Sequence, residues 1–324
     1  MCTAIYESSP RPLFGRTLDL ECSYGESIVL TPRLFELRFI HESSAPSHQA
    51  ILGVACLHEG YPLYYDAVNE AGLAAAALSF MGNARYRPKR KGAYNIASAE
   101  LIPWLLSRAE SLSDALSLLR HTNITKYAVS REHEVTPLHW LIADKSGALT
   151  LETGVGGVKI YENPVGVLSN SPPFDYQMTN LANYMSAKSA PPQNTLCPDT
   201  ELVHYSRGMG GLGLPGDFSS PSRFVRAVFA KNHTSAAKNK KEAVSRFFHI
   251  MDTVSQPRGS ALTESGEPIS TVYTCCADLS EKTYYFTTYD CRQIRAVTMS
   301  ALPLDGDRPI SFPMHFEEKI LYLE

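Results

Sequence analysis

Short strand-like segments joined by tight turns limit this chain to a small set of architectures. Segments rich in branched and aromatic residues are separated by Asp, Gly, Asn and Pro, a pattern typical of antiparallel hairpins. They are CTAIYES, LFGRTLDLE, SIVLTPR, AILGVACLH, GLAAAALSF, LHWLIAD, ALTLETG, GVKIYEN and VGVLSNS. Near the C-terminus, residues 270–299 predict three more strands, with turns at DLSEK and DCRQ.

Helical segments lie between these blocks of strands. They are SAELIPWLLSRA, SLSDALSLLRHT, PSRFVRAVFAKN and KKEAVSRFFHIMDTV, and Ser111 and Asp114 in the second resemble a capping box. The order strands, helices, strands, helices, strands favours a layered α+β architecture with antiparallel sheets. Residues 186–217 are rich in Pro and Gly and have no periodicity. A loop of this length usually has a function or packs against another subunit.

Composition excludes several classes of protein. With 44% hydrophobic residues among 324, the chain can bury a large core. The net charge of -3 provides no overall positive field, so we expect no nucleic acid partner. The basic segment RYRPKRKG follows a Gly-Asn turn and is interpreted as a solvated loop.

The seven cysteines are scattered without C-x-x-C spacing, which argues against a disulfide framework and against a zinc site. This agrees with a reducing compartment. The sequence has no run of about 18 apolar residues and no signal-peptide pattern at its start. We therefore expect a cytoplasmic protein without membrane insertion.

The first twenty residues predict a β-hairpin, because SPRP separates two strand-like segments. With the turn centred near Pro10, Cys2 lies opposite Leu18 and Asp19, and Arg16 is its diagonal neighbour. Side chains alternate between the faces of a strand, so Arg16 and Asp19 lie on opposite faces unless the strand bends or bulges. In an unbroken strand they reach different parts of Cys2.

Cys2 follows the initiator methionine and is small enough for Met1 to be removed in the cell. Removal leaves one residue with both a thiol and a free α-amine. Such an amine, with a pKa of about 7.7 to 8.0, can accept the thiol proton, so no histidine is needed. A nearby arginine favours the thiolate. The alternative is that Cys2 is a small apolar core residue.

Other catalytic motifs are missing from the sequence. It has no G-x-S-x-G, H-E-x-x-H or P-loop lysine motif, and GMGGLGLPG lacks the strand-to-helix context of a dinucleotide site. His139 lies in an apolar strand, where a hydrogen-bonded structural role is favoured. Asn170 precedes a Pro-Pro turn, and it either caps that turn or donates its carboxamide N–H to an oxyanion in a cleft.

Five segments together resemble the choloylglycine hydrolase family, which includes bile salt hydrolases and penicillin V acylases. They are MCTAI, FGRTLDLE (14–21), NEAGLAAAALSF (69–80), LSNSPPFDYQ (168–177) and GLGLPGDFSSPSRFVR (211–226), in family order over essentially the whole chain. The resemblance implies a single N-terminal nucleophile hydrolase domain, residues 2–324, with Met1 removed. Its implied fold is a four-layer αββα sandwich of two antiparallel sheets between helices, assembled as a homotetramer.

The resemblance also implies roles for individual residues. Cys2 matches the nucleophile, Arg16 the arginine that contacts the thiol, and Asp19 the aspartate that orients the α-amine. Asn170 matches the oxyanion-hole asparagine, and Arg223 of PSRF matches a second arginine that steadies the charges. Without the resemblance, Arg223 is interpreted as a surface residue at the start of a helix.

Ser79 stands where bile salt hydrolases commonly carry Asn and penicillin V acylases Tyr. The family uses the backbone N–H at this position in the oxyanion hole, and serine keeps that donor. The side chain, however, gives no indication of the substrate class.

The implied function is hydrolysis of glycine- or taurine-conjugated bile salts through a thioester on Cys2, without a metal or an organic cofactor. We expect an apolar pocket for the steroid, lined by Leu18, Phe80 and the loop ITKYAVSREHEV. We also expect residues 186–217 to pack between subunits and to reach a neighbouring active site. Two alternatives remain open: a penicillin V acylase with the same machinery, and an inactive binding protein that retains Met1 and buries Cys2.

Overall fold

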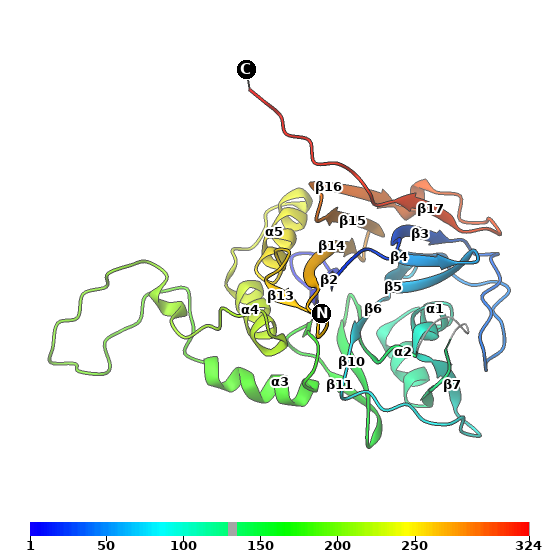
Figure 1. Ribbon diagram of the computed structural model, residues 1–324, viewed down its shortest axis with the longest axis horizontal. Helices are drawn as coiled ribbons and strands as arrows, with labels where there is room; N and C mark the ends of the chain where they lie inside the picture. Colours follow the sequence, from blue (N-terminus) through cyan, green and yellow to red (C-terminus); the bar gives the residue numbers. More distant parts are fainter. Residues whose placement is uncertain (129–134, 324) are drawn as a thin grey trace.

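The computed structural model describes residues 1–128 and 135–323. Most of its strands form two antiparallel sheets that pack face to face (Figure 1). The seven-stranded sheet contains β1 (Cys2–Glu7), β2 (Leu13–Leu20), β12 (Val167–Leu168), β13 (Ala261–Leu262), β14 (Pro268–Asp278), β15 (Thr283–Thr288) and β16 (Cys291–Thr298). The eight-stranded sheet contains β3 (Ser27–Thr31), β4 (Ile51–His58), β5 (Tyr61–Asn69), β6 (Ala74–Ser79), β9 (Leu138–Asp144), β10 (Gly147–Gly154), β11 (Gly157–Glu162) and β17 (Ile310–Pro313).

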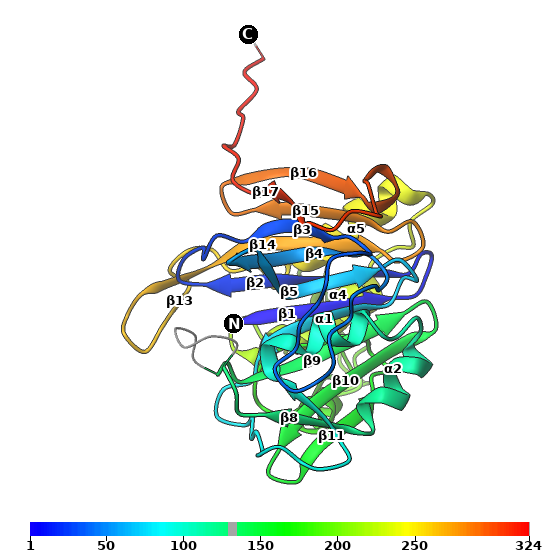
Figure 2. The same cartoon turned by 90° about the vertical axis from the view of Figure 1, so that its right-hand side faces the viewer.

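Helices cover the outer face of each sheet. On the seven-stranded sheet, α4 (Ser220–His233) contacts β1 and β12, and α5 (Lys240–Asp252) contacts β2 and β14. On the eight-stranded sheet, α1 (Leu101–Leu106) contacts β5 and β6, and α2 (Leu112–Leu119) contacts β9 and β10. Figure 2 looks onto the faces of the sheets, with α1 and α2 in front. The predicted αββα sandwich is confirmed.

Two apolar clusters hold these layers together. The larger includes Ala4, Leu18 and Leu78 between the sheets and Ile5, Phe224 and Phe247 under α4 and α5. The smaller lies beneath α1 and α2 around Trp104 and Trp140. Among the described residues, no helix is long and apolar enough to cross a membrane.

The N-terminal hairpin forms with the predicted register. Cys2 faces Leu18, and Ala4 faces Arg16, which makes Arg16 the diagonal neighbour of Cys2. β2 also pairs with β14 so closely that a Cβ at Gly15 would lie 1.9 Å from the Cys275 carbonyl oxygen. Only glycine fits there, and the close approach fixes the position of Arg16 next to it.

Several elements differ from the sequence-based expectation. β5 was not predicted, because it contains Pro62 and its inner half is buried on both faces, which removes the apolar and polar alternation. The short parallel pair β7 (Tyr94–Ala97) and β8 (Thr122–Thr125), the two-residue β13 and the edge strand β17 were also missed. So was α3 (Phe174–Leu181), which follows the Pro-Pro turn.

The predicted helices otherwise form, with some changes at their ends. Ser111 caps α2 by accepting a bond from the Asp114 N–H, as expected. The first predicted helix begins as a 3-10 turn (Ser98–Glu100) that leads into the shorter α1. Further 3-10 turns lie at Ala182–Tyr184, Met209–Gly211 and Met299–Ala301. The basic segment 85–92 has no helix or strand, in agreement with the predicted loop.

Candidate active site

Cys2 lies at the start of β1, at the inner face of the seven-stranded sheet, and only 3% of its surface is exposed. The Arg16 Nη2 group lies 2.5 Å from its sulfur. Cys2 and Arg16 share this face because they belong to paired strands and their side chains point the same way. The alternation of β2 thus places a guanidinium against the thiol, as the hairpin register predicted.

Arg16 is fully buried and is held by main-chain carbonyls of the opposite sheet. Its Nη1 group donates to the Ala77 oxygen at 2.5 Å and to the Tyr65 oxygen at 3.2 Å. These carbonyls are available because β5 pairs with β6 only as far as Asp66 and Ala76, and the two strands separate beyond that point. The guanidinium therefore occupies the place where the ladder opens.

The charges around Arg16 favour its cation. Burial alone would lower the pKa of the guanidinium, but the acidic groups that face it raise that pKa above its usual value. The first of these is Cys2, followed by Tyr273, Asp66 and Cys275. By reciprocity, a permanently charged Arg16 stabilises a thiolate on Cys2.

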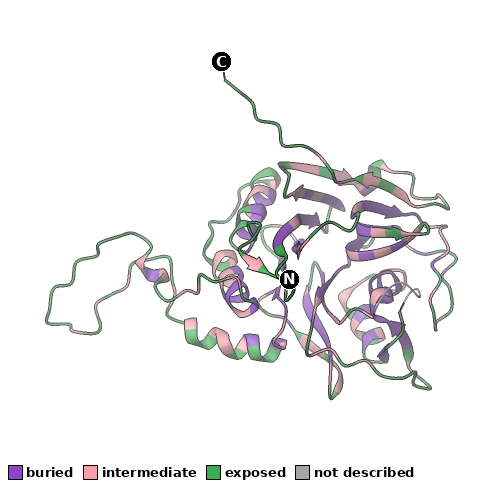
Figure 3. Ribbon diagram, viewed as in Figure 1, coloured by how far each residue is buried: buried purple, intermediate pink, exposed green. Residues whose placement is uncertain are grey.

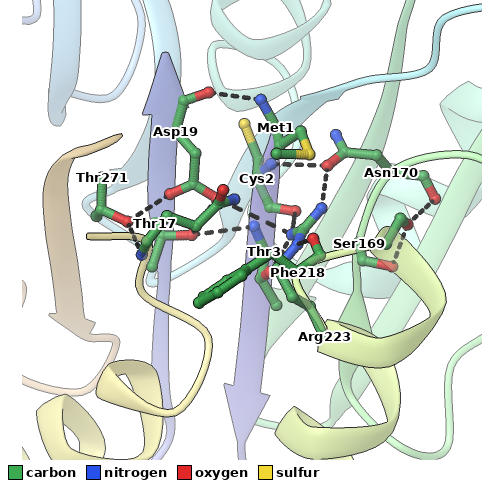
Figure 4. Close-up of polar contacts among 12 residues, drawn as sticks. Met1, Cys2, Thr3, Thr17, Asp19, Ser169, Asn170, Phe218, Arg223 and Thr271 are labelled. Atoms are coloured by element: carbon green, nitrogen blue, oxygen red, sulfur yellow. Dashed lines mark hydrogen bonds and ion pairs between the residues drawn. The ribbon is translucent and has the colours of Figure 1, made fainter. Parts of the chain in front are cut away.

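Asp19 lies on the other face of β2, toward the helices. Its carboxylate accepts hydrogen bonds from Thr271 Oγ1 at 2.7 Å and from Gln256 Nε2 at 3.0 Å. The main chain of Asp19 pairs with Met1: Met1 N donates to the Asp19 oxygen at 2.5 Å, and Asp19 N donates to the Met1 oxygen at 2.8 Å (Figure 4). Arg16 thus contacts Cys2 through its side chain, whereas Asp19 contacts Met1 through its main chain and holds its carboxylate on the other face, as an unbroken strand requires.

Arg223 connects these groups from the first turn of α4. Its Nη1 group donates to the Cys2 oxygen at 2.5 Å and lies 4.0 Å from the Asp19 carboxylate. Its Nη2 group donates to Asn170 Oδ1 at 2.8 Å (Figure 4). The side chain is completely buried, which lowers its pKa while Asp19 and Cys2 act to raise it. The interpretation of Arg223 as a surface residue is therefore wrong.

Asn170 follows β12 and reaches both Cys2 and β6. Its Oδ1 accepts from the Cys2 backbone N–H at 2.7 Å, and its Nδ2 donates to the Ser79 oxygen at 2.8 Å. An amide nitrogen carries two hydrogens, and this bond uses one of them. The side chain thus points into the site and does not cap the Pro-Pro turn.

The main chain of Ser79 also faces this side. Ser79 lies opposite Leu138 of β9, while the next residue, Phe80, donates its N–H to the Pro137 oxygen. In an antiparallel ladder this pattern turns the N–H and C=O of Ser79 away from β9. They point toward the gap beyond the end of the β5 pairing, where Asn170 lies.

A cavity of about 290 Å³ lies beside Arg16. The described residues that line it are mostly apolar or aromatic and include Leu63, Tyr65, Ala77 and Leu138. Tyr65 and Ala77 are the residues whose carbonyls bind Arg16. Arg16 therefore links the main chain of two residues in the cavity lining to the Cys2 sulfur.

The cavity differs in part from the predicted pocket. Leu18 and Phe80 do not line it, because both are buried in the core and Phe80 stacks on His139 at 4.3 Å. Of the predicted loop 124–135, Tyr127, Ala128 and Val135 do line it, and residues 129–134 lie outside the described residues.

The structure brings the predicted site residues Cys2, Arg16, Asp19, Asn170, Arg223 and Ser79 together. It adds Thr271 and Gln256 beside Asp19, which no sequence motif indicated. His139 has the structural role expected of it, since it is fully buried with Nδ1 3.1 Å from Glu152. Among residues 1–128 and 135–323, no group of three or more His, Cys, Asp or Glu side chains is arranged to hold a metal ion.

Comparison with known proteins gives the same picture at the level of the whole chain. Residues 2–312 match the family model of the linear amide C–N hydrolases, choloylglycine hydrolase family. The bile salt hydrolase/transferase of Lactiplantibacillus plantarum is 43% identical over 317 residues, which cover 98% of this chain and 98% of that protein.

Solved structures match over the same extent. A crystal structure of a mutant conjugated bile acid hydrolase from Clostridium perfringens has a TM-score of 0.92 at 30% identity and covers 100% of both chains. Penicillin V acylase from Agrobacterium tumefaciens has a TM-score of 0.77 at 21% identity, with 98% of this chain and 94% of that one covered. The second likeness concerns the fold.

Proposed function

Because this chain belongs to the choloylglycine hydrolase family of linear amide C–N hydrolases, we propose that it cleaves the amide bond of glycine- or taurine-conjugated bile salts, with Cys2 as nucleophile. The observation that carries the proposal is the 2.5 Å contact between Arg16 Nη2 and the Cys2 sulfur. It places a permanent cation on the one thiol whose own nitrogen becomes an α-amine once Met1 is removed.

In the proposed reaction, the Cys2 α-amine takes the proton of the thiol, and the thiolate attacks the amide carbonyl. The oxyanion accepts hydrogen bonds from the Ser79 N–H and from the second hydrogen of Asn170 Nδ2. The tetrahedral intermediate then collapses, the C–N bond breaks, and the Cys2 ammonium returns its proton to the departing glycine or taurine. Water, deprotonated by the same amine, hydrolyses the thioester and releases the bile acid.

Asp19 and Arg223 hold the N-terminus for this reaction. Arg223 binds the Cys2 oxygen and the Asn170 side chain, so it fixes the nucleophile and one oxyanion donor relative to each other. The Asp19 carboxylate balances the charge of Arg223 at 4.0 Å. In the proposal, this pair orients the α-amine after Met1 is removed.

The cavity beside Arg16 supports the proposal that the acyl group of the substrate is apolar. It is lined by Leu63, Leu138, Val135 and several tyrosines, which suit the ring system of a bile acid. The proposal therefore places the steroid in this cavity and the conjugated amino acid on the other side of the scissile bond.

The test is a substrate panel of taurocholate, glycocholate and penicillin V, run with the parent enzyme and with Cys2→Ala. We expect bile salt hydrolysis in the parent and a fall of at least about 10³-fold in Cys2→Ala. Much faster turnover of penicillin V would favour the acylase alternative. Full activity in Cys2→Ala, or an intact Met1 in active enzyme by mass spectrometry, would contradict the nucleophile assignment.

The same thioester can be attacked by an amine in place of water, and the relative from Lactiplantibacillus plantarum is named as both hydrolase and transferase. We include acyl transfer in the proposal for this chain. With free taurine or glycine in excess over cholyl donor, mass spectrometry should detect exchange of the amino acid. Its loss in Cys2→Ala would assign both reactions to one site.

Residues 186–217 support a homotetramer as part of the proposal. They extend away from the body of the molecule (Figures 1 and 3) and expose Leu196, Leu202, Val203 and Tyr205. Apolar side chains on an arm of this length need a second surface to cover them. We propose that this surface belongs to another copy of the chain, and that the assembled enzyme works in the cytoplasm.

A further inference from the structure

A second buried carboxylate, Asp66, lies close to the site and has no part in the reaction described above. Asp66 belongs to β5 of the eight-stranded sheet and is 1% exposed. It accepts hydrogen bonds from Tyr273 Oη at 2.6 Å, from Cys275 Sγ at 3.4 Å and from the Tyr284 hydroxyl. All three donors come from β14 and β15, so Asp66 reaches across to the other sheet.

Beside Asp66, the Arg16 side chain reaches between the sheets in the opposite direction. From β2 of the seven-stranded sheet, Arg16 binds the main-chain oxygen of Tyr65, the residue next to Asp66. Asp66 and Cys2 are both among the negative groups that act on the guanidinium, and Arg16 is the cation that acts on Asp66. One buried cation therefore interacts with two groups that compete for its charge.

The donors around Asp66 suit the ionised form of its carboxyl group. Burial raises the pKa of Asp66 above its usual value, and the charge of Arg16 and the bonds from Tyr273, Tyr284 and Cys275 lessen that rise. Burial also raises the pKa values of Tyr273, Tyr284 and Cys275 well above their usual range, which keeps these groups protonated. Three protonated donors converge on one acceptor, the arrangement that suits a carboxylate.

We propose that Asp66 is a positioning residue that acts through Arg16: its carboxylate takes up part of the guanidinium charge, so that the Cys2 thiolate forms readily but stays reactive. This inference rests on the proposed role of Cys2 as nucleophile. A thiolate that is stabilised too strongly loses nucleophilicity, because nucleophilicity falls with the basicity of the thiol.

The test replaces Asp66 by asparagine, which has nearly the same shape, still accepts a hydrogen bond and carries no charge. The readout is the rate at which iodoacetamide alkylates Cys2 in Met1-free enzyme, followed against pH on the N-terminal peptide by mass spectrometry. In Asp66→Asn we expect the midpoint of the titration to move down by about one pH unit, since a nearby negative charge is gone. The rate at the alkaline plateau should fall several-fold.

The matched control is Asp278→Asn. Asp278 is also a fully buried carboxylate, but it pairs with Arg11 at 2.8 Å at the far end of the β2–β14 ladder. Asp278→Asn should leave the midpoint of the Cys2 titration unchanged. An equal shift in Asp278→Asn, or an unchanged midpoint in Asp66→Asn, would overturn the proposal.

If Asp66→Asn does not fold, the variant Asp66→Leu, Tyr273→Phe, Tyr284→Phe removes the carboxylate together with two of its donors and leaves neither hydroxyl unpaired. It should show the same downward shift, and an unchanged midpoint in it would overturn the proposal. Failure of this inference differs from failure of the proposed function. Failure of this inference appears in the alkylation rate of the Cys2 sulfur, which is measured without substrate. Failure of the proposed function appears as bile salt hydrolysis that persists in Cys2→Ala.

Discussion

At the scale of single residues, the site depends on a guanidinium that water cannot solvate. Removing a cation from water costs several kcal/mol unless its donors find acceptors in the protein. Arg16 distributes its donors among the Thr17, Tyr65 and Ala77 carbonyls and the Cys2 sulfur. Lysine, with one compact ammonium group, cannot bind acceptors in so many directions. The fold therefore requires arginine here, and the sulfur is one of the acceptors that make its burial possible.

Ser79 allows the proposed oxyanion hole to be tested at its main chain. Ser79→Pro removes the N–H, and it does so without breaking the ladder, because that N–H points away from β9. We expect kcat to fall by about 10²- to 10³-fold. Steady-state kinetics with a conjugated bile salt is the measurement.

The control for this change is Ser79→Ala, which keeps the N–H and removes only the hydroxyl group. It should stay within about twofold of the parent, since the side chain has no role in the proposed chemistry. A large loss in Ser79→Ala would mean that the hydroxyl group itself takes part.

At the scale of secondary-structure elements, a buried glutamate joins α1 to a surface loop. Glu100, at the start of α1, accepts the Ile40 N–H at 2.9 Å and is 2% exposed. Burial raises its pKa to about 7, while the backbone hydrogen bonds from Ile40 and Ala97 act to lower it. The folded protein therefore binds this proton more tightly than the unfolded chain does.

The raised pKa of Glu100 predicts a loss of stability with rising pH. The stabilisation is fully present below the unfolded pKa of 4.5, declines as the pH rises, and is gone above the folded pKa of about 7. The shift corresponds to about 3 kcal/mol. Glu100→Gln should remove this slope and stabilise the protein above neutral pH by up to about 2 kcal/mol, because no charge is buried.

Urea unfolding at about pH 5 and about pH 8 measures this difference. Glu110→Gln, at an exposed position a short distance along the chain, is the control and should leave the slope unchanged. Equal slopes in the parent and in Glu100→Gln would contradict the assignment.

The N-terminal hairpin was predictable because its turn fixes the register and the register fixes the faces, so Cys2, Arg16 and Asp19 could be placed from the sequence. β5 could not be found, since a strand buried on both faces loses its alternation. Asp66 and Tyr273 are 207 residues apart in the sequence, and their contact depends on how the two sheets stack. Arg223 was recognisable only through the family resemblance, because nothing local distinguishes a buried arginine at a helix start from an exposed one.

At the scale of the whole molecule, the arm formed by residues 186–217 is attached at a narrow base. Lys188 N donates to the Gly210 oxygen at 3.0 Å, and a Cβ at Gly210 would lie 2.1 Å from the Ala190 oxygen. The two ends of the arm are thus pressed together, while its outer part is exposed. This is a suitable geometry for an element that packs against another subunit.

Substitution of Leu202, Val203 and Tyr205 by serine tests the arm. If these side chains are buried between subunits, the triple variant should dissociate into smaller species, because each substitution removes apolar area from the interface. Size-exclusion chromatography with light scattering gives the mass. Val155→Ser, at an exposed apolar position in the turn between β10 and β11, should leave the assembly intact. A fully active tetramer of the triple variant would exclude a role for the arm in assembly.

The pairing of Met1 with Asp19 determines when Met1 can be removed. In the folded chain, the Met1 nitrogen and carbonyl oxygen are both bound to the main chain of Asp19 in β2, and the Cys2 nitrogen is bound to Asn170. An aminopeptidase has to bind the same atoms. Under our proposal it therefore removes Met1 at the ribosome, before the nascent chain has folded. Molecules that fold before Met1 is removed keep this methionine and remain inactive. Rapid overexpression should therefore increase the fraction of inactive enzyme without reducing the amount that is folded.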